Sequence, residues 1–359
     1  MIHKLPMTIV PTPFISLILP IRNEAAYIEH CLQAILAQDY PGQMEVLIVD
    51  GMSTDDTRAI IESVSVRHAA FNIQILDNPD KIVPTGINIA LCQAKGEVIV
   101  RVDGHTLIAP DYVRRCVEAL QRSGADNVGG RMKAISGSLF GKAVALATST
   151  PFGVGGSRFH YSEQEEFVDT VYMGAWPRQV FERIGLFDEE LVRNQDDEFN
   201  YRLRAVGGKI LLSPAIKSEY TVRSTPRALW RQYFQYGFWK IRVLQKHSRQ
   251  MSLRQFVPPL FVLALLFSAP LAFFPATRFL SLAIPITYLL ANLAASFLTA
   301  FRAQKSNQFP FTIYHLLLPF TFAILHISYG LGFLLGLFKF WNRWGDKKGK
   351  VPVWDNTIV

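Results

Sequence analysis

The distribution of charge along the 359 residues constrains the fold more than any other feature. Asp, Glu, Lys and Arg occur regularly up to about Gln255, whereas Arg278 is the only one of them between Gln255 and Phe301. Three stretches in this region are near or above the roughly 20 residues that a bilayer-spanning helix needs: 256–274, 280–300 and 312–338. Buried helices of a large soluble core are the alternative, but they would keep a polar face, and these stretches show almost none. We therefore predict a membrane region behind an N-terminal domain.

The predicted layout has four parts: a domain over 1–222, basic and aromatic interfacial helices over 223–255, a transmembrane region over 256–338, and a basic tail over 339–359. Much of the formal net charge of +8 precedes the first apolar stretch, at Arg223, Arg227, Arg231, Lys240, Arg242, Lys246, Arg249 and Arg254. A nucleic-acid surface would also be basic. The interleaved aromatic residues and the apolar stretch that follows favour anionic lipid headgroups. We expect a membrane partner and no nucleic acid.

The orientation follows from the charge asymmetry and the N-terminus. Met1–Phe14 carries three prolines and no sustained apolar run, so we predict no secretory signal and a large N-terminal domain that faces the cytosol from the inner membrane. Three full crossings would place the basic tail outside, against the positive-inside tendency. The third stretch contains Pro319 and three glycines (330, 332 and 336), so we expect it to be a re-entrant or split element.

Strand-like and helix-like patterns alternate through the first hundred residues. Short apolar runs occur at 15–19, 45–49, 72–76 and 97–102, and stretches with helical spacing lie between them at 24–37, 57–66 and 84–94. This alternation predicts an α/β domain with a mostly parallel sheet, helices on both faces and ligands at the carboxyl ends of the strands.

Polar residues follow three of these predicted strands. Pro20 to Glu24 follow the first, Asp50 follows the second, and Asp103 and His105 follow the fourth. Each alone could be an ordinary turn or cap residue. As a set at one sheet edge they indicate a ligand site, and because Asp103 and His105 alternate, both side chains can face one cation.

The order of these motifs resembles the family 2 glycosyltransferases of the GT-A fold over residues 15–240. The resemblance rests on Pro20-x-Arg22-Asn23-Glu24, Asp50-Gly51-x-Ser53-x-Asp55, Lys81 with Asn88, Asp103-x-His105, and Asp196 within the segment 194–203. More narrowly, the segments 101–105 and 231–237 are similar to those of membrane-anchored glucosyltransferases of succinoglycan-type exopolysaccharide assembly.

The resemblance implies a nucleoside diphosphate sugar as donor, bound by Pro20, Glu24, Asp50, Lys81 and Asp103. It also implies a divalent metal on the donor diphosphate, held by Asp103 and His105. Where the family has a second carboxylate this chain has His105, and imidazole suits manganese better than magnesium. A turn or helix-cap role for His105 is the alternative.

Asp196 matches the family's catalytic base, which removes the proton of the acceptor hydroxyl in a single inverting displacement. The glutamine-x-x-arginine-tryptophan signature of processive synthases is absent from the sequence, which favours transfer of one sugar. We expect a UDP-glucose type donor and a lipid-linked saccharide acceptor in polysaccharide biosynthesis. The alternatives are glycosylation of a membrane lipid, such as polyprenyl phosphate or diacylglycerol, and an inactive scaffold of an assembly complex.

Overall fold

The computed structural model describes residues 12–305 and 313–354. The chain divides into two compact units, which are described separately: the first comprises 1–133, 162–220 and 349–359, and the second comprises 134–161 and 221–348. Two segments therefore group differently from the predicted layout. Residues 134–161, expected in the N-terminal domain, belong to the unit of the C-terminal helices, and the end of the basic tail belongs to the first unit.

The first unit is built on a mixed nine-stranded sheet. Its first four strands are parallel in the order β3-β2-β1-β4 and comprise β1 (Ile15–Ile21), β2 (Met44–Asp50), β3 (Asn72–Asp77) and β4 (Val98–Arg101). The path continues as β8-β6-β9-β5, with antiparallel pairings of β8 on β4 and β5 on β9. These strands are β5 (Thr106–Ile108), β6 (Asn127–Ile135), β7 (Glu166–Phe167, paired with β9), β8 (Ala175–Pro177) and β9 (Ile210–Thr221). The predicted α/β fold is confirmed, and its later strands add an antiparallel half.

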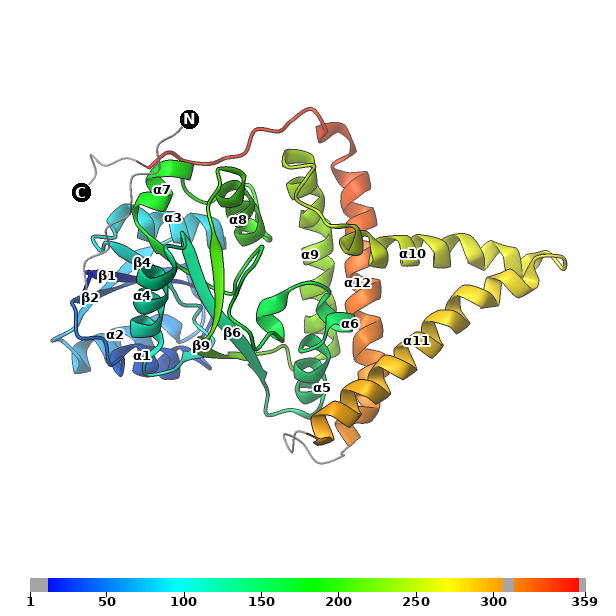
Figure 1. Ribbon diagram of the computed structural model, residues 1–359, viewed down its shortest axis with the longest axis horizontal. Coiled ribbons are helices and arrows are strands. Elements are labelled where there is room, and N and C mark those ends of the chain that lie inside the picture. Colours follow the sequence, from blue (N-terminus) through cyan, green and yellow to red (C-terminus); the bar gives the residue numbers. More distant parts are fainter. Residues whose placement is uncertain (1–11, 306–312, 355–359) are drawn as a thin grey trace. The chain divides into compact units, whose positions relative to one another are not determined.

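Helices cover both faces of the parallel strands, as Figure 1 shows for α3 on one side and α1 and α2 on the other. The helices of this unit are α1 (Ile28–Leu36), α2 (Thr57–Arg67), α3 (Val83–Gln93), α4 (Tyr112–Ser123), α7 (Gln179–Ile184) and α8 (Gln195–Ala205). In α1 the buried positions Ile28, Cys31, Leu32 and Ile35 recur at helical spacing and pack into the core.

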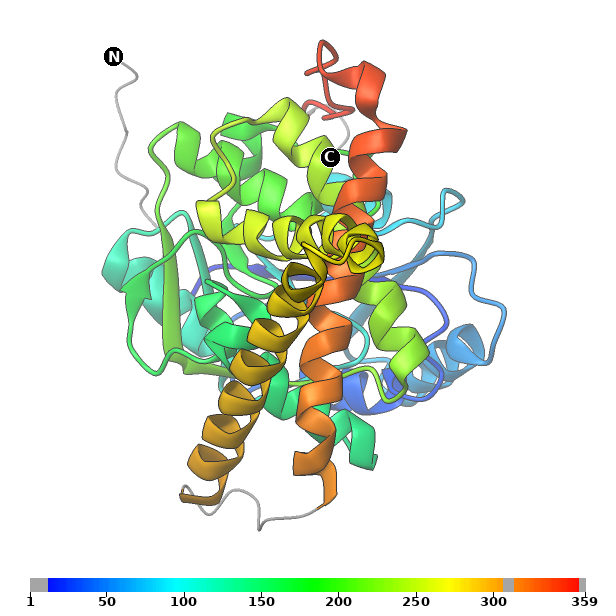
Figure 2. The same cartoon turned by 90° about the vertical axis from the view of Figure 1, so that its right-hand side faces the viewer.

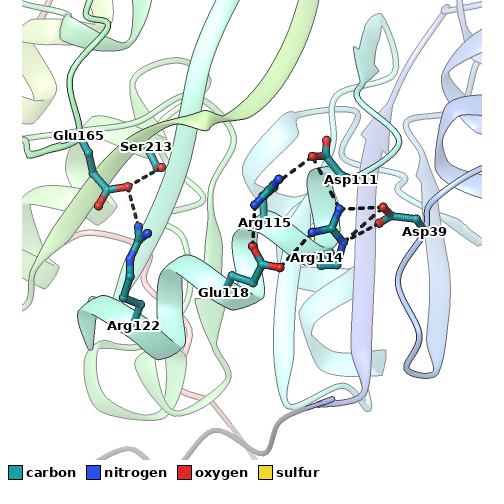
Figure 3. A network of polar contacts seen from close by, with 8 residues as sticks. All are labelled: Asp39, Asp111, Arg114, Arg115, Glu118, Arg122, Glu165 and Ser213. Atoms are coloured by element: carbon teal, nitrogen blue, oxygen red, sulfur yellow. Dashed lines mark hydrogen bonds and ion pairs between the residues drawn. The ribbon is translucent and has the colours of Figure 1, made fainter.

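The outer surface of α4 carries a network of ion pairs (Figure 3). Arg114 contacts Asp39 at 2.9 Å and Glu118 at 3.0 Å, and Arg115 joins Asp111 to Glu118. Since these side chains are substantially exposed, such pairs contribute little to the free energy of folding. The network marks the solvated face of the helix.

The second unit is helical. Its elements are α5 (Leu139–Thr148), α6 (Pro151–Val154), η1 (Arg158–His160), α9 (Pro226–Lys246), η2 (Leu253–Phe256), α10 (Val257–Ser268), η3 (Ala269–Phe273), α11 (Arg278–Lys305), η4 (Ile313–Leu317), α12 (Leu318–Lys339) and η5 (Trp341–Arg343). Three apolar helical segments are long enough to cross a membrane: Leu253–Phe273, Ser281–Gln304 and His315–Lys339.

The third apolar segment is one continuous helix from Leu318 to Lys339, so the expected split is wrong. Pro319 lies in the first turn, where its missing N–H costs no hydrogen bond. The glycines serve packing instead. A Cβ on Gly332 would lie 2.0 Å from the carbonyl oxygen of Phe234, and one on Gly237 would lie 2.0 Å from that of Tyr329. Helices α9 and α12 therefore approach closely through small residues.

Part of the basic stretch does not face lipid headgroups, contrary to expectation. Lys240, Arg242 and Lys246 are buried within the protein. The Arg242 guanidinium donates to Gln245 Oε1 at 2.6 Å and to the carbonyl oxygen of Arg343 at 3.4 Å. Buried cations need such acceptors, and these come from the chain that follows α12.

Residues 349–354, here called the C-terminal strap, dock within the first unit. Asp188 Oδ1 accepts a hydrogen bond from the Lys350 amide at 2.8 Å, and the Leu186 amide donates to the Pro352 carbonyl at 3.0 Å. The Trp354 ring stacks on Phe181 with centroids 6.1 Å apart. The end of the tail is thus a structural part of the N-terminal domain.

Candidate active site

The site is built where β1, β2 and β4 end side by side. The three strands are parallel neighbours, with Ile21 beside Asp50 and Ile18 beside Arg101, so the loops after them meet at one edge of the sheet. The loop after β1 is bonded to the loop after β2. Asn23, at a φ of 56°, donates from its amide to Ser53 Oγ at 2.9 Å and accepts from the Thr54 amide at 2.9 Å.

Asp50 is buried at the end of β2 and shapes the turn that follows. Its Oδ1 accepts from both the amide and the hydroxyl of Ser53, at 3.0 and 2.6 Å, and its Oδ2 lies 3.8 Å from the Arg58 guanidinium. Asp55 accepts from the Thr57 amide at 3.1 Å at the start of α2. These contacts give the motif after β2 a rigid backbone.

Glu24 and His105 meet across the site. Glu24 Oε1 lies 2.9 Å from His105 Nδ1, and the Glu24 amide donates to Thr57 Oγ1 at 2.7 Å. The His105 ring also packs edge-on against Tyr220 with centroids 5.1 Å apart. Both side chains are only partly exposed, 19% for Glu24 and 16% for His105. The carboxylate and the tyrosine ring fix the orientation of the imidazole, with its Nε2 opposite the bonded nitrogen.

Asp103 is held by a buried arginine on the same face of the chain. Arg101 Nε donates to Asp103 Oδ1 at 2.8 Å, and Arg101 is 8% exposed. Burial lowers the pKa of Arg101, but the carboxylates of Asp103 and Asp196 outweigh it and raise the pKa above its ordinary value. The two carboxylates, for which the sequence predicts different roles, therefore both act on the charge of one buried arginine.

Asp196 occupies the first turn of α8, after Asn194 at a φ of 62°. Burial and the neighbouring Asp197 raise the pKa of its carboxyl group, while Arg101 opposes the rise. A carboxylate with a raised pKa accepts a proton more readily, as a general base must. The predicted base therefore has the right character and lies in the electrostatic field of the Arg101–Asp103 pair.

The acids after Asp196 in α8 differ in their surroundings. Glu198 is buried and pairs with Arg202 Nε at 2.7 Å, one helical turn along, while Arg202 Nη2 donates to the Leu186 carbonyl at 2.7 Å. Arg202 is therefore a structural partner of the acidic first turn of α8. Glu198 is held in this ion pair, whereas the side chain of Asp197, next to Asp196 in the sequence, is partly exposed.

The remaining predicted donor residues lie around α3. Pro20 is 3.4 Å from the position of a Cβ on Gly86, and Lys81 is exposed at a φ of 63° in the turn before the helix. Asn88, quoted with Lys81 in the motif, is buried and bonds both the amide and the carbonyl of Phe187, each at 2.9 Å. Its role is to fix the loop before α8.

The described residues include part of the ligand set that a divalent metal would need. Across residues 12–305 and 313–354, no group of three or more His, Cys, Asp and Glu side chains could hold a cation. Asp103 and His105 could supply one oxygen and one nitrogen ligand, and a carboxylate behind a histidine, as Glu24 is behind His105, is the usual support of a metal-bound imidazole. Such a site would need the oxygens of a bound diphosphate to complete it.

Comparison with known proteins places this arrangement in a family. The model of glycosyl transferase family 2 matches residues 16–185. The succinoglycan biosynthesis protein ExoA of Rhizobium meliloti is 31% identical over 259 residues, which cover 72% of this chain and 76% of the relative. The chain belongs to glycosyl transferase family 2.

Two further proteins are similar to this family 2 glycosyltransferase. The first is the dolichyl N-acetyl-alpha-D-glucosaminyl phosphate 3-beta-D-2,3-diacetamido-2,3-dideoxy-beta-D-glucuronosyltransferase of Methanococcus voltae, 32% identical over 65% of this chain and 74% of the relative. The second is the solved mannosyltransferase PcManGT of Pyrobaculum calidifontis in complex with GDP-Man and Mn2+. It has a TM-score of 0.56 and 19% identity, and the match covers 92% of this chain and 91% of that one. This likeness shows the GT-A fold.

Two features of the site were not predicted from the sequence. Arg101 is the last residue of a buried apolar strand and lies two positions before Asp103, so the two side chains can point to the same side of the chain. A single cation at this spacing could have predicted the ion pair. Tyr172 and Tyr220 had no local signal, because only the antiparallel half of the sheet brings them to the site. There Tyr172 bonds Thr106 through their hydroxyls at 2.6 Å and packs edge-on against Tyr220.

Proposed function

We propose that this glycosyltransferase moves one sugar, with inversion, from a nucleoside diphosphate sugar of the UDP-glucose type to a lipid-linked saccharide in polysaccharide biosynthesis. The observation that carries the proposal is the buried Arg101, which donates to Asp103 Oδ1 at 2.8 Å and whose pKa is raised by the carboxylates of Asp103 and Asp196. Arg101 thus bonds the carboxylate that we propose to bind the diphosphate, and it interacts electrostatically with the carboxylate that we propose as the base.

The chain's own residues would divide the work. Asp103 and His105 would hold a divalent metal on the donor diphosphate, and their imidazole ligand would suit Mn²⁺. That metal supplies charge stabilisation for the leaving diphosphate. Glu24 fixes the His105 ring, and Arg101 fixes the Asp103 carboxylate while balancing its charge. Pro20, Asp50 and Lys81 would contact the nucleotide of the donor.

Asp196 completes the reaction on the acceptor side. Its carboxylate takes the proton of the acceptor hydroxyl as that oxygen attacks the anomeric carbon, and the bond to the diphosphate breaks on the opposite face. One displacement inverts the anomeric centre. The first-turn position of Asp196 on α8 gives the base a fixed direction, and its raised pKa matches proton acceptance.

The names of two relatives support the acceptor class. One is a succinoglycan biosynthesis protein, and the other names a dolichyl-linked sugar phosphate. The apolar helices of this chain would hold the enzyme in the inner membrane with its catalytic domain on the cytosolic side, within reach of lipid-linked acceptors. Glycosylation of a membrane lipid itself is the second candidate, favoured by the same helices.

The experiment is a transfer assay with purified protein in lipid nanodiscs. Radiolabelled UDP-, GDP- and dTDP-sugars are offered with polyprenyl diphosphate saccharides, polyprenyl phosphate or diacylglycerol, and the anomeric configuration of the product is determined by NMR. We expect label on the lipid-linked saccharide with inverted configuration. Label on bare lipid would favour the second candidate, and a retained configuration would refute the role of Asp196. If no donor binds and no label moves, the chain is the inactive scaffold.

A further inference from the structure

The three apolar segments are not equivalent in their packing. Only 17% of the apolar window is buried within the protein in Leu253–Phe273 and in Ser281–Gln304, whereas 50% is buried in His315–Lys339. The exposed side chains of the first two are large and apolar on several faces, including Leu266, Phe267, Phe279, Leu290 and Phe297. Exposed apolar surface of this extent marks an interaction site, and the length of both segments suits a lipid bilayer. The third segment lacks a comparable all-round exposure because α9 covers it.

The path of the chain limits the number of crossings. The chain leaves the first unit after Tyr220 and returns to it at Gly349, and the C-terminal strap is bonded there through Asp188 and Leu186. Both ends of the intervening helical unit therefore lie on the side of the membrane that holds the catalytic domain. The number of crossings between them is even, so three crossings are impossible.

Helix α12 is the segment that does not cross. It runs parallel to α9, since Gly332 faces Phe234, Gly336 faces Phe238, and Gln245 Nε2 donates to the Phe340 carbonyl at 2.7 Å. Figure 1 shows the two helices side by side. If α12 spanned a bilayer, α9 would lie at the same depth.

The charges of α9 make that depth untenable. Gly237 packs against Tyr329 near the middle of the third apolar segment. At 1.5 Å per residue, Arg231 and Arg242 lie within about 10 Å of that level along the helix. Both would fall inside a hydrocarbon core about 30 Å thick. Arg231 is exposed on the surface and would face lipid tails, which is costly for a cation.

We propose that α10 with η3 and α11 form a hairpin that crosses the bilayer twice, and that the α9–α12 pair stays on the catalytic side as a membrane-surface platform. The proposal rests on the membrane attachment in the proposed function. Figure 1 shows α10 and α11 diverging from α12 and meeting at a tip, and Figure 2 views that hairpin from its tip.

The charges of the hairpin agree with this orientation. Its catalytic-side ends carry Arg254 and Arg302, while the tip carries Arg278 with the exposed rings of Phe273 and Phe274. Two crossings also keep the basic tail on the catalytic side, which removes the conflict with the positive-inside tendency. In this arrangement the hydrocarbon core of the bilayer contacts α10, η3 and α11, and the lipid headgroups contact the α9–α12 platform.

Cysteine accessibility tests the topology independently of transfer activity. Cys31, Cys92 and Cys116 are replaced by alanine, and single cysteines are introduced by Ala70→Cys, Ala276→Cys, Gln304→Cys and Lys348→Cys, all at exposed positions. A membrane-impermeant maleimide is applied to sealed right-side-out and inverted vesicles. We expect Ala70→Cys, Gln304→Cys and Lys348→Cys to react from one side and Ala276→Cys from the other.

Lys348→Cys decides between two crossings and three. Its labelling from the side opposite to Ala70→Cys would overturn the proposal, as would labelling of Ala276→Cys from the same side as Ala70→Cys. If the cysteine-free protein does not fold, a specific protease site inserted after Gly345 in the natural sequence serves instead. Cleavage from the catalytic side supports two crossings, and cleavage from the opposite side refutes them. Neither the labelling nor the cleavage depends on sugar transfer, so the test of the topology remains valid if the proposed function is wrong.

Discussion

Glu24 Oε1 and His105 Nδ1 lie 2.9 Å apart, which joins the loop after β1 to the loop after β4 and leaves one imidazole nitrogen for another ligand. The pair turns two motifs that are 81 positions apart in sequence into one unit. Since a supporting carboxylate sets the tautomer and orientation of a metal-bound histidine, Glu24 should act through His105.

Replacement of Glu24 should therefore weaken metal binding. Glu24→Ala is expected to lower the affinity for Mn²⁺ in the presence of UDP by about 10–100-fold, with Glu24→Gln in between. Electron paramagnetic resonance of free Mn²⁺ during titration measures this without any turnover. Glu29→Gln is the matched control, because Glu29 pairs with the exposed Arg67 at 2.7 Å. Equal affinities for Glu24→Ala and the control would mean that Glu24 contacts the nucleotide alone.

Removal of the metal should stop transfer. Excess chelator is expected to abolish activity, and added Mn²⁺ should restore it more fully than Mg²⁺. His105→Asp should keep some activity and shift the preference toward Mg²⁺, because an oxygen ligand suits the harder ion. Asp103→Ala should be nearly inactive. Initial rates across a series of metal concentrations measure all three, and full activity in excess chelator would end the metal hypothesis.

The close crossing of α9 and α12 should depend on its glycines. In Gly237→Val the new side chain would collide with the Tyr329 backbone, since even a Cβ would lie 2.0 Å from the carbonyl oxygen. We expect a loss of about 1–3 kcal/mol in stability, as for other overpacked interiors, with a lower melting temperature in detergent. Gly345→Ala, where a Cβ meets nothing within 4 Å, should be neutral. Equal melting temperatures would show that the two helices do not pack as described.

Local patterns were enough to predict the parallel strands and their helices, because each element from β1 to β4 has its own periodic signal. Local patterns also placed Asp50, Asp103 and His105 at one sheet edge, since parallel strands end together. The glycines of the third apolar segment were misread as breakers. Their role in packing against α9 depends on a helix about a hundred residues earlier in the chain, which no local window contains.

The charge pattern of the sequence also failed to predict where some basic side chains lie. Lys240, Arg242 and Lys246 look like lipid-facing cations in sequence, but they are buried, and the carbonyl groups after α12 accept from Arg242. The electrostatic interaction of Arg101 with Asp196 could not be predicted from local patterns either, since the two charges lie on a strand and a helix about 95 positions apart in the chain. Periodic patterns in the sequence do not show which residues far apart in the chain come into contact.

The three acids at the start of α8 should respond differently to neutralisation. Asp196→Asn should bind donor nearly normally and lose about 10²–10⁴-fold in turnover, as expected for a general base. Glu198→Gln should instead cost about 1–3 kcal/mol of stability, because it breaks the buried contact with Arg202. Asp197→Asn should be milder in turnover. Single-turnover rates, donor titrations and melting curves on the three variants separate these effects. A dead Asp197→Asn with an active Asp196→Asn would move the base by one residue.

The pH dependence of transfer should carry the signature of Asp196. Burial and Asp197 raise the pKa of this carboxyl group, and Arg101 opposes the rise. The acid limb of kcat/KM should therefore lie above about 3.9, the ordinary pKa of an aspartate. Asp197→Asn removes a negative neighbour, so Asp196 should ionise more easily and the acid limb should move to lower pH. A raised folded-state pKa also means that the ionised group opposes folding as pH rises through the unfolded and then the folded pKa. The melting temperature of Asp196→Asn should consequently equal or exceed that of the natural protein at pH 7. Any such gain in melting temperature should disappear at a pH below the unfolded-state pKa of Asp196. An acid limb that Asp197→Asn leaves in place, measured with a metal concentration that saturates the enzyme at every pH, would assign that limb to another group.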